Sequence, residues 1–137
     1  MRWLTRHAKG LLVLYGLFLV FALLSPTSGV QSDAVSWLGR VLGGVGASDA
    51  ITGQRRLEFV MNAVIIAPVP FLGALLLPRY SWRDWTAVGF VGSALVELTQ
   101  GLLLSGRSPT FIDVVANTLG ALLGAGSAAL VRRRPGS

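Results

Sequence analysis

Four long apolar runs set what this chain can fold into. They extend over about residues 9–25, 57–77, 85–104 and 111–131, and none alternates apolar and polar residues as a barrel strand would. About twenty apolar residues in a helix cover the hydrocarbon core of a bilayer. The chain is 53% hydrophobic and 13% charged, whereas soluble domains carry about 25% charged residues. The sequence therefore predicts an all-α integral membrane bundle with about four transmembrane helices, in a single membrane domain over residues 1–137.

The first run allows two interpretations. It follows Arg2, Arg6 and Lys9 and stops at Ser25 and Pro26. A basic start, a short apolar stretch and small residues after it also fit a secretory signal. No clear cleavage site follows, so we favour a retained helix over a cleaved segment.

The second run should be irregular, and a further short helix should precede it. Pro68 and Pro70 stand near the middle of the run, where each removes a backbone donor and should kink or break a helix. In the connection before it, Asp33 is a candidate helix cap. Apolar residues follow at helical spacing, which predicts a short extracytoplasmic helix in the membrane interface; they are Ala34, Trp37, Leu38, Val41 and Val45.

The basic residues predict the orientation in the membrane. Of the 12 Lys and Arg, eight flank one side of the predicted bundle and four flank the other. The eight are Arg2, Arg6, Lys9, Arg79, Arg83, Arg132, Arg133 and Arg134, and the four are Arg40, Arg55, Arg56 and Arg107. The richer side faces the cytoplasm in most membrane proteins, so both termini should be cytoplasmic. Because the basic residues sit at the ends of apolar runs, the net charge of +6 does not point to nucleic acid.

Polar residues interrupt the apolar runs on one side of the membrane only. An ionisable group at the centre of a bilayer costs roughly 2.5–3.5 kcal/mol on insertion scales, so such residues need a structural or functional reason. With the predicted orientation they all fall in the extracytoplasmic half. They are Asn62 in the second run, Glu97 and Gln100 in the third, Arg107 in the following turn, and Asp113 and Asn117 in the fourth.

Small residues should pack the last two helices. On the fourth helix, Asp113, Asn117, Gly120 and Gly124 share one side. A second row on the third helix consists of Gly89, Ser93, Glu97 and Gly101. Small residues four apart let helices approach closely in lipid. We expect the two rows to face each other, with Gly120 and Gly124 as packing residues.

The chemistry of the polar residues leaves three roles open. They could form a purely structural network, a site for a ligand or lipid headgroup, or a catalytic centre. Arg107 can bind a carboxylate or phosphate with two parallel hydrogen bonds, and Asn117 and Gln100 can donate and accept. The sequence contains no cysteine. It shows no nucleophile with an adjacent base, no metal-ligand cluster and no phosphate-binding loop, so we predict no catalytic residue, metal or cofactor.

At this point the pattern resembles a known family. Glu97 and Gln100, followed by Arg107, Asp113, Asn117, Gly120 and Gly124, resemble the signature of the VanZ-like family of small bacterial membrane proteins. Asn62 with Pro68 is similar to an earlier motif of that family, although Pro70 stands where the family usually has Gly. The resemblance covers about residues 57–131. It implies a multi-pass protein of the bacterial cytoplasmic membrane, and the family name comes from a member linked to low-level teicoplanin resistance.

These observations favour a binding or shielding protein at the outer leaflet. Its partners would be membrane lipids and an amphiphile such as a lipoglycopeptide or a cell-wall precursor, and a homo-oligomer stays open. Asn62, Glu97, Gln100, Arg107, Asp113 and Asn117 would form the ligand site or polar network. The alternatives are a small lipid or solute transporter, a purely structural network, and an intramembrane enzyme that uses Glu97 and Asp113.

Overall fold

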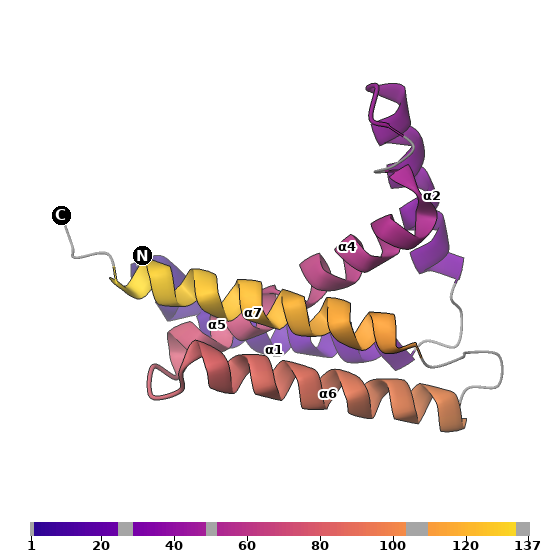
Figure 1. Cartoon of the computed structure of the whole chain (residues 1–137). Coiled ribbons are helices and arrows are strands. Elements are labelled where there is room, and N and C mark those ends of the chain that lie inside the picture. Colours follow the sequence, from indigo (N-terminus) through magenta and orange to yellow (C-terminus); the bar gives the residue numbers. More distant parts are fainter. Residues whose placement is uncertain (1, 25–28, 49–51, 104–109, 134–137) are drawn as a thin grey trace.

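Helices are the regular elements in the part of the chain that the structure describes. This computed structural model describes residues 2–24, 29–48, 52–103 and 110–133. Figure 1 shows α1, α5, α6 and α7 grouped lengthwise, while α2 and the start of α4 rise away from them. The predicted all-α fold is confirmed. In chain order the helices are α1 (Arg2–Leu24), α2 (Gly29–Gly44), α4 (Gln54–Ile66), α5 (Pro68–Leu76), α6 (Trp82–Leu103) and α7 (Phe111–Arg133).

Three helical stretches among the described residues are long and apolar enough to cross a membrane. They are Gln54–Leu76, Trp82–Leu103 and Phe111–Arg133, with mean hydropathies of 2.2, 1.3 and 1.7. They coincide with the second, third and fourth predicted runs. Large apolar side chains point outward from them; Leu98 is 60% exposed and Leu123 62%. Such a surface suits lipid rather than water, so the chain is a helical membrane protein.

α1 coincides with the first predicted run and packs against α5. Its outward side carries Leu14 and Phe21, which are 69% and 77% exposed. Ala8 and Leu19 lie buried on its inner side. The hydroxyl of Tyr15 donates a hydrogen bond of 2.6 Å to the carbonyl oxygen of Ile65. This bond ties α1 to the last turn of α4.

The second predicted span is broken at its prolines, as the sequence predicts. α4 ends at Ile66 and α5 begins at Pro68, with Ala67 between them. Proline has no N–H to donate, and its ring crowds the carbonyl four residues back. Pro68 and Pro70 fall in the first turn of α5, where N–H groups have no partner inside the helix in any case. The break therefore lets α4 change direction without losing bonds within α5.

α7 is the central helix of the bundle. It packs against α6 and against both α4 and α5 (Figure 1). Most of its buried residues are small, which lets neighbouring backbones come close. They are Val114, Ala116, Asn117, Gly120, Ala121, Gly124, Ala125 and Ala128.

Two glycines of α7 lie directly on the backbone of the broken helix. A Cβ atom on Gly120 would collide with the carbonyl oxygen of Ala63, and one on Gly124 would collide with that of Ala67. Only glycine fits at these two positions without a shift of backbone. Gly120 and Gly124 therefore lie at a close contact between helices, which is the kind of position predicted for them.

The helix predicted to pack against Gly120 and Gly124 is wrong. They face α4 and the start of α5, whereas the sequence predicts that they face α6. The residue that α7 turns toward α6 is Ala121, because a Cβ atom on Gly89 of α6 would collide with the Ala121 Cβ. Consecutive residues of a helix point about 100° apart. Gly120 can thus face the broken helix while Ala121 faces α6, and α7 contacts both neighbours through small residues.

α2 confirms the helix expected between the first two spans, although its start differs. It begins at Gly29, so Asp33 lies inside the helix and does not cap it. Gly39 faces α4, where a Cβ atom would lie 3.2 Å from Cδ1 of Leu57. Trp37 points outward and is 60% exposed. α2 therefore has one face on α4 and a second, partly apolar face outside, and its place in the membrane interface stays a prediction.

The end of the bundle opposite the start of α7 is held by local hydrogen bonds. The N–H of Ser81 donates to Oδ2 of Asp84 at 2.7 Å, and the N–H of Asp84 donates to Oγ of Ser81 at 3.3 Å. This reciprocal pair is a capping box that starts α6 at Trp82. Arg132 of α7 donates to the carbonyl oxygen of Ala74 at 2.8 Å, which joins the end of α7 to α5.

Substitution of Gly124 tests the close contact between α7 and the broken helix. Gly124→Ala should lower the free energy of unfolding by about 1–3 kcal/mol, because an overpacked core must shift its backbone. Gly126, two residues along, is the matched control, since a Cβ atom there meets nothing within 4 Å. Gly126→Ala should leave stability unchanged or raise it by up to about 1 kcal/mol through helix propensity. Thermal unfolding in detergent gives both values; equal stability of the two variants would contradict the contact.

Candidate functional site

Two acidic side chains meet where α7 begins. Thr110 precedes the helix, and its N–H donates to Oε2 of Glu97 on α6 at 3.0 Å. Its hydroxyl donates to Oδ2 of Asp113 in the first turn of α7. The first N–H groups of a helix have no partner inside it, and the helix dipole favours negative charge there. Glu97 thus accepts a backbone N–H at the start of α7 from the neighbouring helix, and Asp113 accepts from the Thr110 hydroxyl at the same place.

Asn62 brings α4 into the same group. Its Nδ2 donates to Oδ1 of Asp113 at 2.9 Å, although the two residues are 51 positions apart. Each oxygen of the Asp113 carboxylate therefore has its own donor. Within the described residues both donors are neutral, so they hold the carboxylate in place without cancelling its charge. We call Asn62, Glu97, Thr110 and Asp113 the polar cluster; it joins α4, α6 and α7.

The polar cluster lies at an open end of the bundle. Thr110 is exposed, and Asn62, Glu97 and Asp113 are each partly exposed. Gln100 and Asn117 lie deeper and are 5% and 7% exposed. The predicted site residues therefore divide into an accessible group and a buried pair.

A pocket extends from Asn117 into the bundle. It has a volume of about 220 Å³ and lies between α1, the α4–α5 segment, α6 and α7. Asn117 and Ser93 are polar residues of its lining. The Ser93 hydroxyl donates to the carbonyl oxygen of Phe90 at 3.1 Å, so its own helix satisfies it. We call this space the inner pocket.

Arg107 is the one predicted site residue whose position is not described. It belongs to residues 104–109, which lie outside the described ranges. In the sequence it stands three residues before Thr110. Its predicted role in ligand binding therefore stays a prediction.

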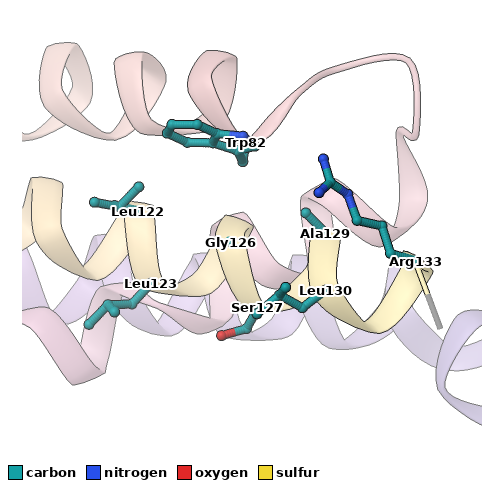
Figure 2. Close-up of a pocket in the computed structure, with 8 residues that line it drawn as sticks. All are labelled: Trp82, Leu122, Leu123, Gly126, Ser127, Ala129, Leu130 and Arg133. Carbon is teal, nitrogen blue, oxygen red and sulfur yellow. The ribbon is translucent and has the colours of Figure 1, made fainter.

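A second hollow lies at the opposite end of α7. It has a volume of about 390 Å³ and lies between the start of α6 and the last turns of α7. Figure 2 shows Trp82 above α7 and the guanidinium of Arg133 on the same side of the helix, with Gly126 on α7 below Trp82. Ser127 and Arg133 are its polar lining residues, and both are exposed. This outer hollow is a shallow surface feature.

Two residues of this arrangement were missing from the sequence-based prediction. Thr110 supplies two of the donors in the polar cluster, and a Thr three residues before an acid at the start of a helix resembles a capping box. That spacing, Thr110 to Asp113, could have been recognised. The bond from Tyr15 to the Ile65 carbonyl had no comparable signal, because it depends on how α1 packs against the break.

Comparison with known protein families matches residues 11–132 to the family VanZ/LLP1. Comparisons with curated proteins and with solved structures gave no match. The matched segment covers most of the 137 residues and contains the polar cluster, the broken helix and the glycines of α7. The chain belongs to the VanZ/LLP1 family.

Proposed function

We propose that this VanZ/LLP1-family membrane protein binds or shields the charged headgroup of an amphiphile at the outer leaflet of the bacterial cytoplasmic membrane. The observation that carries the proposal is the Asp113 carboxylate, which is fixed at an open end of the bundle by two neutral donors. A fixed negative charge near a low-dielectric interior attracts a cation more strongly than one in bulk water. An ammonium group of a headgroup is a fitting partner.

Arginine side chains would supply the complementary charge. Arg107 would bind a phosphate or carboxylate of the same headgroup through its planar guanidinium. Arg55 and Arg56 lie exposed at the start of α4, where they line a shallow hollow with Gln54 and Glu58. Together with the acids of the polar cluster, these arginines would suit a headgroup that carries both signs of charge.

The orientation is part of the proposal. Figure 1 places the N-terminus of α1 and the C-terminus of α7 at one end of the bundle, away from the start of α7. Of the eight basic residues counted above, all but Arg134 belong to described segments that begin or end near that end, which favours a cytoplasmic position for it. The polar cluster would then face outward. α1 would be a fourth span, because it is 23 residues long and carries exposed apolar side chains.

A transporter is the second candidate, because the span between Gln54 and Leu76 is broken. Broken helices near the middle of a membrane often bind transported ions or substrates with freed backbone groups. Here protein packs closely around the break: Gly124 lies against the Ala67 carbonyl, which also accepts from the N–H of Phe71, and the Ile65 carbonyl accepts from Tyr15. This packing favours binding at the polar cluster over transport through the break.

Single cysteines test the orientation, since the chain has none of its own. Gln54→Cys, at the end with the polar cluster, should react with a membrane-impermeant maleimide in intact cells. Pro78→Cys, between α5 and α6, should react only after the cells are permeabilised. The reverse pattern would place the polar cluster in the cytoplasm and overturn the proposed outer-leaflet site.

Arg107→Ala tests the headgroup site itself. In nanodiscs it should weaken binding of lysophosphatidylethanolamine about tenfold or more, because hydrogen bonds to charged groups contribute about 1.5–3 kcal/mol. Arg133→Ala, at the opposite end of α7, is the matched control and should bind as the unchanged protein does. The amount of each variant in membranes must also be measured. Loss of the Arg107→Ala protein from the membrane would indicate a purely structural network instead.

The family resemblance adds a link to lipoglycopeptide resistance. If the protein shields an outer-leaflet target, its expression should raise the teicoplanin concentration that stops growth of a susceptible bacterium. The same pair of arginine variants applies: Arg107→Ala should remove the increase and Arg133→Ala should keep it. Equal susceptibility to teicoplanin with and without the unchanged protein would rule out this link to resistance. Headgroup binding would still be decided by the nanodisc assay.

A further inference from the structure

Asn117 is directed into the inner pocket by the packing of α7. Gly120 and Gly124 of α7 face the broken helix, and Ala121 faces α6. Asn117 lies one turn before Gly120 and Ala121, so its side chain falls between these two contact directions. The residues that line the inner pocket around it include Val69 on the α5 side and Gly92 on α6. The amide therefore borders the space between the two neighbours of α7.

Asn117 is a buried polar residue at the wall of the inner pocket. Its side chain is 7% exposed. A buried amide that gives up water without a new hydrogen bond destabilises a protein. Nearly all buried polar groups in proteins are paired. A buried amide at a pocket wall is therefore a group with which a ligand atom can pair.

The inner pocket has the form of a channel for one hydrocarbon chain. It extends along α6 from Trp85 to Val96, which is about 16 Å at 1.5 Å per residue. Apart from Ser93 and Asn117, the residues used here, Leu19, Val69 and Val96, are apolar. Pockets for drug-sized ligands measure about 300–1,000 Å³. A volume of about 220 Å³ is below that range and fits a single chain rather than a ring system.

Asn117, one of the two polar residues named for this channel, lies next to the polar cluster. Asn117 is one helical turn from Asp113, so both face the same end of the bundle. Trp85 lies at the other end, near the start of α6. A molecule with its headgroup at Asp113 would therefore place its first hydrocarbon linkage at Asn117 and its chain end near Trp85.

The outer hollow lacks these features. Its polar lining residues, Ser127 and Arg133, are exposed and lie on the surface of α7 (Figure 2). Neither is a buried group in need of a partner. It therefore serves as an internal comparison for the inner pocket.

We propose that the inner pocket holds one acyl chain of the bound amphiphile, with the carbonyl that links the chain to the headgroup accepting a hydrogen bond from Asn117. The proposal rests on the headgroup site proposed above and names the class of ligand for it: an ester- or amide-linked acyl amphiphile. The chain end lies against Trp85.

Trp85 makes the proposal measurable by fluorescence. In a chain with Trp3, Trp37 and Trp82 replaced by Phe, Trp85 is the remaining tryptophan. The probe is lysophosphatidylethanolamine with a brominated acyl chain, added to nanodiscs of unbrominated lipid. Bromine at the chain end should quench Trp85 saturably and more strongly than bromine beside the carbonyl. A matched chain that keeps only Trp82, in the outer hollow, should show no saturation.

Two glycines provide a matched pair of variants. A Cβ atom meets nothing within 4 Å at Gly92, in the inner pocket, or at Gly126, in the outer hollow. Gly92→Phe should fill the channel and abolish saturable quenching, while Gly126→Phe should keep it. If Gly92→Phe does not accumulate in membranes, Gly92→Leu takes its place. The comparison of the two bromine positions needs no variant in the pocket.

Asn117→Leu separates a ligand contact from a structural one. It removes the buried amide and keeps the side-chain volume similar, so it should leave the melting temperature of the empty protein unchanged or higher and weaken binding of the probe. A lower melting temperature with unchanged binding would overturn the role of Asn117.

The outcomes distinguish the two proposals. Equal quenching from both bromine positions, saturation at Trp82, or unchanged saturation in Gly92→Phe would overturn the chain site. If binding of the probe still depends on Arg107 in that case, the proposed headgroup site stands without the chain site. If Arg107→Ala binds the probe as well as the unchanged protein, the proposed function fails, whatever the quenching shows.

Discussion

The close contact between α7 and the backbone of the broken helix organises the rest of the molecule. Gly120 and Gly124 lie against the Ala63 and Ala67 carbonyls, and no larger residue fits there. In a membrane, helices gain little from apolar burial, so close packing of small residues must supply much of their association. The contact also fixes which way every other residue of α7 faces: Asp113 toward α4, Ala121 toward α6, and Asn117 between them.

This arrangement explains how acids can stand at the end of a membrane bundle. Asp113 and Glu97 accept hydrogen bonds from an amide, a hydroxyl and a backbone N–H at the start of α7. The donors hold the carboxylates in place, and the helix dipole favours them there. In the described residues the donors of Asp113 are neutral, so its charge stays available. A network that served only to join helices could use amides alone, and the retained charge is what favours a headgroup site.

Much of the fold could be predicted because it depends on local patterns. Apolar run length locates the spans, Pro68 and Pro70 locate the break, and spacing identifies Gly120 and Gly124 as packing residues. Their partner could not be predicted, because two adjacent faces of α7 both carry small residues and spacing does not say which neighbour each face meets. The bond between Asn62 and Asp113 likewise depends on the tertiary contact of α4 with α7. Sequence spacing does identify both residues as polar members of one half of the bundle.

The central claim is that the carboxylate at position 113 serves a ligand and does more than join helices. The most direct test exchanges the pair, combining Asn62→Asp with Asp113→Asn. An amide at 113 can donate to the new carboxylate at 62 and accept from Thr110, so the hydrogen bonds between helices are kept while the charge moves to α4. We predict a melting temperature close to that of the unchanged protein and a clear loss of lysophosphatidylethanolamine binding. Unchanged binding in the exchanged protein would contradict the claim and leave the polar cluster a purely structural role.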